Sequence, residues 1–192
     1  MIAAFSCREN NREAYTPANK GENMALAHLI CGSTGAGKTT YALKLAERQQ
    51  AVRFTLDDWM KNLFWMDCPE PLEYEWALER VKRCEERILS VCSEMAGMDV
   101  EIVLDFGFFE KAQRERVMQA LDDMGIASRL HYLPVQAGER WKRVDMRNRL
   151  RGGTFFLEVS RGMFDFCENL FEEPDKSELR GAVIVDGEAG LV

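Results

Sequence analysis

Residues 32–39 read GSTGAGKT, so that Gly32, Gly37, Lys38 and Thr39 occupy the fixed positions of the pattern G-x-x-x-x-G-K-[ST]. Glycines let backbone N–H groups curve around phosphate oxygens with no side chain in the way. A Gly-rich turn with an exposed lysine would not need Lys38 and Thr39 in register. The pattern therefore predicts a phosphate-binding loop (a P-loop) made of Gly32, Ser33, Thr34, Gly35, Ala36, Gly37, Lys38, Thr39 and Thr40.

The sequence on either side of this loop has the expected context. A short apolar run, 25–30, precedes the loop and predicts a buried strand, while 40–50 carries apolar residues at helical spacing. The amino end of such a helix presents free N–H groups and a favourable dipole to an anion. Lys38 supplies a charge for the β and γ phosphates and the Thr39 hydroxyl a ligand for Mg²⁺. These residues predict binding of a nucleoside triphosphate, with Mg²⁺ as its metal.

Strands and helices alternate along the rest of the chain. Apolar runs at 52–56, 100–104, 128–133 and 182–185 predict further strands, and helical spacing predicts helices at 71–95, 111–124, 138–151 and 160–171. Alternation of this kind indicates an α/β fold, a doubly wound parallel sheet with helices on both faces. Right-handed crossovers place the loops that follow the strands along one edge, where ligands bind in such sheets.

Asp105 ends the apolar strand Ile102-Val103-Leu104. In P-loop proteins an acid at this position holds Mg²⁺ directly or through water. The next residue is Phe106 rather than the glutamate that many hydrolases use to activate water. The absence of an adjacent glutamate favours transfer to a substrate over hydrolysis.

Two consecutive acids, Asp57 and Asp58, follow the second predicted strand. A carboxylate at this edge can accept the proton of a substrate hydroxyl as it attacks the γ phosphate. Consecutive side chains point in different directions, so only one acid is expected to face the phosphates. The alternative is that one of them caps a helix through Trp59, and the two roles are compatible.

The predicted helix 138–151 is strongly basic in an otherwise acidic chain; its cations are Arg140, Lys142, Arg143, Arg147, Arg149 and Arg151. Arg140, Arg143 and Arg147 share one face. Planar guanidinium groups suit phosphate oxygens and the charge of a phosphoryl-transfer transition state. With Gly152-Gly153 as a hinge, the helix is expected to act as an arginine-bearing lid. The alternative is a solvated face paired with Glu139 and Asp145.

Length and composition set further bounds. The chain has 192 residues, 46% of them hydrophobic, which favours one domain at 24–192 preceded by a flexible polar leader at 1–23. A net charge of −7 argues against a nucleic-acid partner. No apolar run approaches the roughly 18 residues of a membrane span. The six cysteines lack metal-site spacing, which suits a reducing compartment, and we expect a cytoplasmic location.

Five segments together resemble the small P-loop kinase and AAA-type ATP-binding family related to zeta toxins, chloramphenicol phosphotransferase and polynucleotide 5′-kinase: GSTGAGKTT, LDDWM, IVLDFGFFEKAQRERV, ERWKRVDMRNRLRG and FDFCENLFEEP. The resemblance implies a five-stranded P-loop NTPase fold of the nucleotide-kinase type, and ATP with Mg²⁺. Asp57 would be the general base. Lys38 would bind the phosphates, and Thr39 and Asp105 the metal. Arg147 and Arg151 would be the catalytic lid arginines, with Arg143 a further nucleotide-binding candidate.

The sequence thus favours an ATP-dependent kinase that phosphorylates a hydroxyl of a small molecule. A polynucleotide 5′-hydroxyl kinase and a nucleotide-binding switch without transferase activity are the alternatives. Aromatic residues near the acceptor side, such as Trp59, Phe106, Phe108 and Phe109, either line a pocket or belong to the core. If extended, Phe108 and Phe109 cannot both point into the same core, so one of them is expected to face the cleft.

Overall fold

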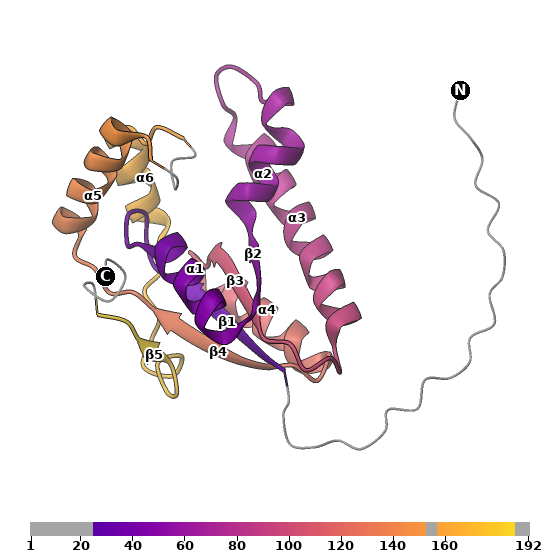
Figure 1. Cartoon of the computed structure of the whole chain (residues 1–192). Helices are drawn as coiled ribbons and strands as arrows, with labels where there is room; N and C mark the ends of the chain where they lie inside the picture. Colours follow the sequence, from indigo (N-terminus) through magenta and orange to yellow (C-terminus); the bar gives the residue numbers. More distant parts are fainter. Residues whose placement is uncertain (1–24, 153–156, 187–192) are drawn as a thin grey trace, which may run out of the picture.

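A computed structural model describes residues 25–152 and 157–186 of the chain. Within them, five strands form one parallel sheet in the order β2-β3-β1-β4-β5 (Figure 1). The strands are β1 Leu26–Cys31, β2 Val52–Thr55, β3 Ile102–Gly107, β4 Ala127–Tyr132 and β5 Val183–Ile184. The predicted five-stranded parallel sheet is confirmed. The leader expected at 1–23 lies outside the described residues.

Helices cover both faces of this sheet. They are α1 Lys38–Gln49, α2 Leu56–Phe64, α3 Tyr74–Met95, α4 Lys111–Asp123, α5 Ala137–Leu150 and α6 Arg161–Leu170, with a short 3-10 helix η1 at Trp65–Asp67. Tyr41 and Leu45 of α1 pack with Ile30 on one face. Buried residues of α3 and α4 pack with Leu29 on the other. The doubly wound arrangement predicted from the strand–helix alternation is therefore confirmed.

The core explains why these segments fold as they do. β1 is the central strand, and Leu29 and Ile30 on its opposite faces are both fully buried. In α3, Cys84, Ile88 and Cys92 recur every fourth residue and are buried, so that a single stripe of the helix faces the sheet. Full burial of a side chain such as Ile88 contributes about 1.5–3 kcal/mol.

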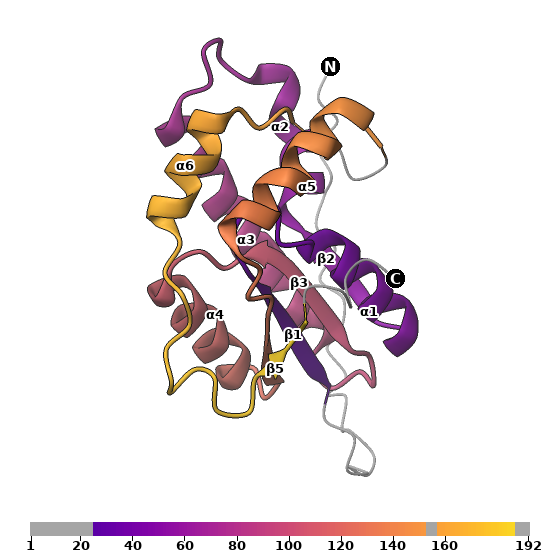
Figure 2. The same ribbon diagram turned by 90° about the vertical axis from the view of Figure 1, so that its left-hand side faces the viewer.

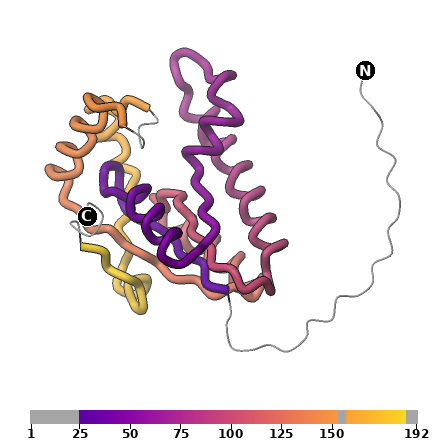
Figure 3. Tube along the Cα trace, in the orientation of Figure 1, coloured from indigo at the N-terminus to yellow at the C-terminus, as the bar shows by residue number. Residues whose placement is uncertain are grey.

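The carboxyl ends of the strands meet at one edge. Thr55 of β2 lies opposite Asp105 of β3, and Cys31 of β1 lies opposite Gly107 and Tyr132. Helices α2, α5 and α6 stand above this edge (Figure 2). The tube in Figure 3 shows the same layout, with α2 and α3 on one side and α5 and α6 on the other. The segments that directly follow β1, β2 and β3 therefore begin at the same edge of the sheet.

Three boundaries illustrate the differences from the sequence-based expectation. Leu56 was expected to end a strand, but it opens α2, and its buried side chain explains the error, because a buried apolar residue looks alike in a strand and in a helix. β3 does not end at Asp105 but continues to Gly107. The long helix begins at Tyr74 rather than Pro71.

Candidate active site

The loop after β1 has the backbone that its glycines predict. Gly35 and Gly37 have φ angles of 82° and 95°, a region that other residues adopt only at a cost. A Cβ atom on Gly35 would lie 2.6 Å from the Arg140 carbonyl oxygen, so α5 packs directly against the loop. The first turn of α1 starts at Lys38, and amides of a first turn have no acceptor inside their helix. These amides are available to an anion.

Lys38 lies under this loop. Its Nζ donates a hydrogen bond to the Ser33 carbonyl oxygen at 3.2 Å and lies 5.5 Å from the centre of the Phe109 ring. Burial lowers the pKa of Lys38, while the charges of Asp105 and Asp57 oppose that shift. The ammonium group is thus close enough to two carboxylates, one on β3 and one on α2, for their charges to act on it.

Asp105 is buried, with 6% of its surface exposed. The Thr39 side chain is hydrogen-bonded to its carboxylate. Burial and the Asp57 charge raise the pKa of Asp105, and the Lys38 charge, the Thr39 hydrogen bond and the Arg53 charge lower it. The structure therefore brings together the two residues that the sequence marked as metal ligands, and their oxygens are ligands of the kind that Mg²⁺ prefers.

Asp57 and Asp58 stand in the first turn of α2, and their environments differ. The N-cap position of α2 is Thr55, so the alternative in which either acid caps this helix is wrong. Asp58 pairs with Arg53 at 3.0 Å. The surrounding protein raises the pKa of Asp57, and the charges of Lys38 and Arg147 lower it. Because Asp57 is open to solvent, water weakens this rise in its pKa.

Helix α5 carries the predicted lid arginines, and they have different environments. Arg143 donates to the Ala36 carbonyl oxygen of the loop at 3.4 Å and to Glu139 at 3.3 Å. Arg147 has a buried Nε with no hydrogen-bond partner among the described residues. Burial lowers the pKa of Arg147, and the Asp57 charge opposes this. Arg151 is exposed and pairs with Glu158 at 3.4 Å.

The solvated-face alternative holds for part of α5. Asp145 pairs with exposed Arg149, and Glu139 pairs with Lys142 and Arg143. The face that carries Arg140 and Arg147 is turned inward. Gly152 is described, but Gly153, the second residue of the expected hinge, lies outside the described residues.

This site fits a nucleoside triphosphate with Mg²⁺. The free amides of the first turn of α1, the Lys38 ammonium and the unpaired Arg147 Nε are all donors for phosphate oxygens. A buried guanidinium nitrogen without a partner costs free energy, and an anion would satisfy it. The donor set therefore matches the ligand that the sequence predicted.

The family comparison agrees with this geometry. A family model described as "AAA domain" matches residues 28–164, which include the loop, both acidic positions and α5. The chain belongs to this AAA-domain family. The predicted membership in a small P-loop kinase and AAA-type family is confirmed at the level of family and fold. No curated protein matches the chain.

Solved structures share the fold at low sequence identity. Chaetomium thermophilum Kti12 in complex with ADP-AlF3 has a TM-score of 0.61 at 13% identity, over 83% of this chain and 87% of that chain. The Mycobacterium tuberculosis APS kinase CysC in complex with AMPPNP and APS gives 0.57 at 13%, over 85% and 88%. A gluconokinase from Sinorhizobium meliloti 1021 gives 0.54 at 14%, over 86% and 84%. At these identities the likeness shows the fold of the AAA-domain chain and no more.

One clamp at the P-loop was not anticipated from the sequence. Glu168 of α6 accepts a hydrogen bond from the Ser33 hydroxyl and two from Arg140, each at 2.5 Å. Arg140 also donates to the Thr34 carbonyl oxygen at 3.2 Å. Arg140 is thus a structural clamp that joins α5, α6 and the loop. The only sequence signal was an acid in the segment FDFCENLFEEP, with no indication of its partner.

A small pocket of about 100 Å³ adjoins this clamp, between β4, α5 and α6. Ser33, Arg140 and Glu168 line it, together with Tyr132 and Phe171. Neither Lys38 nor the acidic residues Asp57 and Asp105 do, so this pocket is not the phosphate site.

The two phenylalanines after β3 point apart, as expected, but through a bend rather than an extended chain. Phe108 has a φ angle of 50°, is fully buried and stacks on Phe106. Phe109 instead packs edge-on against Phe171 and lies near Lys38. Phe109 is therefore the ring on the side of the site.

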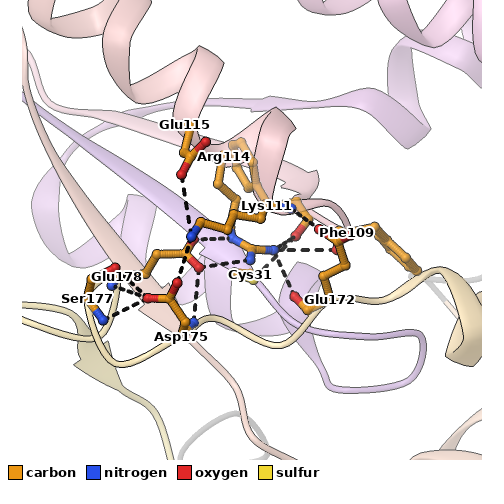
Figure 4. A network of polar contacts seen from close by, with 10 residues as sticks. Cys31, Phe109, Lys111, Arg114, Glu115, Glu172, Asp175, Ser177 and Glu178 are labelled. Carbon is orange, nitrogen blue, oxygen red and sulfur yellow. Dashed lines mark hydrogen bonds and ion pairs between the residues drawn. The ribbon is translucent and has the colours of Figure 1, made fainter.

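A buried arginine holds this bend in place (Figure 4). Arg114 of α4 donates to the carbonyl oxygens of Phe108 and Glu172 at 3.0 and 2.9 Å. It also pairs with Glu178 at 2.6 Å. The network ties the segment after α6 to the loop after β3 and so fixes one wall of the site.

No helix within 25–152 and 157–186 combines the length and the apolar character needed to cross a bilayer.

Proposed function

We propose that the chain is an ATP-dependent phosphotransferase that moves the γ-phosphoryl group of ATP to a hydroxyl of a small-molecule acceptor, with Mg²⁺. Binding of a triphosphate would need only the loop, Lys38, Thr39 and Asp105. Asp57 is not needed for nucleotide binding, and its position is the observation on which the proposal of phosphoryl transfer rests. It is a solvent-accessible carboxylate in the first turn of α2, directly after β2. The surrounding protein raises its pKa, and the charges of Lys38 and Arg147, two cations suited to phosphate, lower it.

The cations and the base have separate roles in this proposal. The loop amides and Lys38 bind the β and γ phosphates, and Arg147 neutralises charge that develops during transfer. Thr39 and Asp105 would hold Mg²⁺, which when bound neutralises phosphate charge. Arg143, next to the Ala36 carbonyl oxygen, would support the closed position of α5 over the nucleotide. Arg151 would reach the site only through movement of the end of α5.

Asp57 would serve as general base. The acceptor oxygen forms a bond to the γ phosphorus, the bond between that phosphorus and the β,γ-bridging oxygen breaks, and ADP leaves. The acceptor proton passes to a carboxylate oxygen of Asp57. A base must be ionised before the reaction; burial raises the pKa of Asp57, and the charges of Lys38 and Arg147 oppose that rise and so favour the ionised form.

Relatives in fold support this class of reaction. The APS kinase is complexed with AMPPNP and APS, and Kti12 with ADP-AlF3, so this fold binds adenine nucleotides in both proteins. An acidic chain favours a small acceptor over a nucleic-acid end. The five described cysteines are free thiols, in keeping with the cytoplasmic location that we propose.

The test is a screen of γ-labelled ATP against nucleosides, sugars, sugar nucleotides, antibiotics and a 5′-hydroxyl oligonucleotide. We expect label on a small alcohol. The Asp57→Asn protein should transfer about 10³-fold more slowly with ATP affinity retained. Asp122→Asn, at an exposed acid of α4, is the matched control and should behave like the parent.

Three outcomes would contradict the proposal. Label on no acceptor points to a nucleotide switch. Label on the oligonucleotide alone points to a polynucleotide kinase. An Asp57→Asn protein as active as Asp122→Asn removes Asp57 from the chemistry.

A further inference from the structure

Arg53 of β2 contacts two carboxylates that belong to different elements. Its Nη2 donates to Oδ2 of Asp58 at 3.0 Å, and its Nη1 lies 3.5 Å from Oδ2 of Asp105. The Arg53 side chain is only 18% exposed, and that of Asp105 is 4% exposed. A guanidinium carries separate nitrogens in a rigid plane, so one side chain can hold two acids at once.

These contacts bear on the Asp57–Asp58 pair. Consecutive helical residues point about 100° apart, because an α-helix has 3.6 residues per turn. Asp58 is engaged by Arg53, while the Asp57 carboxyl is influenced by Lys38 and Arg147. The Asp58 side chain is 57% exposed, and it stands one residue from Asp57. Without a partner it is free to turn toward the same cations.

We infer that Arg53 is a positioning residue that sorts the acidic pair, a role that rests on the proposed function. By holding Asp58 at the edge of β2, it leaves Asp57 as the single acid of the pair that faces the transferred phosphate. Its contact with Asp105 anchors the same guanidinium to β3, so that Asp58 is held against the sheet rather than by a mobile surface group. In this proposal Arg53 itself contacts neither ATP nor the acceptor.

The sorting role makes a distinct prediction about variants. In Arg53→Gln the charge is lost and Asp58 turns toward Lys38 and Arg147, where a second carboxylate opposes the attack of the acceptor oxygen. We expect kcat to fall about 30-fold, since misplaced groups of this kind cost up to about 100-fold, with ATP affinity changed less than about threefold. Arg53→Lys keeps the charge but offers a single nitrogen, and should be intermediate.

The rescue experiment separates sorting from a general structural role. Asp58→Asn in the Arg53→Gln background removes the competing charge, and we expect it to restore most of the lost kcat. The reaction to follow is ADP release from ATP with Mg²⁺, with water as the acceptor. Arg129→Gln, at an exposed arginine of β4, is the control for loss of a strand arginine and should match the parent.

A crystal structure of the nucleotide-free Arg53→Gln protein tests the inference independently of transfer. We expect the Asp58 carboxylate to have moved toward Lys38 or Arg147. If it keeps its position, helix geometry alone directs the pair and the inference is overturned. It is also overturned if Arg53→Gln is as active as Arg129→Gln, or if Asp58→Asn brings no recovery. Failure of the parent to transfer phosphate to any acceptor would contradict the proposed function, while the crystal structure would still test the sorting.

Discussion

Two arginines of this molecule show how a buried cation reveals its role. Arg114 is fully buried, and its guanidinium bonds both Glu178 and the carbonyl oxygens around it. Arg147 also has a buried nitrogen, but that nitrogen has no partner among the described residues. A cation whose donors are all used stabilises the fold. One that is left unsatisfied retains binding capacity for a ligand, which is why we place Arg147 in the active site and Arg114 in its supporting wall.

The largest expected effect concerns Arg147. Replacing it with Met removes a cation from the transferred phosphate, and we expect about 10³-fold slower transfer, as for other arginines that stabilise this kind of transition state. The free energy of unfolding of the Arg147→Met protein should not fall by more than about 0.5 kcal/mol, because no hydrogen bond of the Arg147 Nε is lost. Initial rates and urea unfolding measure the two quantities. A clear loss of stability would mean that Arg147 is structural after all.

Arg114→Met should show the reverse pattern. The change removes the hydrogen bonds that Arg114 donates to Glu178 and to three carbonyl oxygens, and breaking a buried ion pair typically costs about 3–5 kcal/mol. Urea unfolding is again the measurement. A second change, Glu178→Leu, should recover part of the loss, because the unpaired carboxylate is then gone. A stability within about 1 kcal/mol of the parent would refute the assignment.

The two histidines extend the comparison to a third buried cluster. The His131 ring lies between Tyr41 Oη at 2.7 Å and His28 Nδ1 at 2.9 Å. Burial lowers the pKa of His131 to about 4, with the charges of His28, Arg129 and Arg48 acting in the same direction. Both ring nitrogens of His131 have a hydrogen-bond partner, as the nitrogens of Arg114 do, so we expect His131 to act in stability rather than in catalysis.

The pH dependence follows from that shift. The folded pKa of His131 is about 4 and lies below the unfolded value of about 6.5, so between these values the unfolded chain binds the extra proton. Stability should therefore be fully present above pH 6.5 and fall toward pH 4, by an amount on the order of 3 kcal/mol. Urea unfolding at several pH values measures it. His131→Gln should flatten this fall, and an equally steep fall in that variant would contradict the assignment.

Local signals in the sequence were enough to predict the fold and to single out several candidate site residues. The P-loop pattern and the alternation of apolar runs depend on neighbours in the chain, and so do the positions of Lys38, Thr39 and Asp105. Contacts between residues that are far apart in the sequence could not be predicted from such local signals. Glu168 meets Ser33 across 135 residues, and Arg114 meets Glu178 across 64. Arg53 was overlooked because a single arginine in a short strand carries no pattern that names its two acids.

The most direct measurement is a calorimetric titration of ATP with Mg²⁺ into the parent and into Lys38→Ala. We expect one nucleotide per chain in the parent and about 100-fold weaker binding in the variant, since a charge-assisted contact of this kind contributes up to about 3 kcal/mol. A parent that gives no heat of binding, or a variant that binds as tightly as the parent, would contradict the assignment of this loop as a triphosphate site.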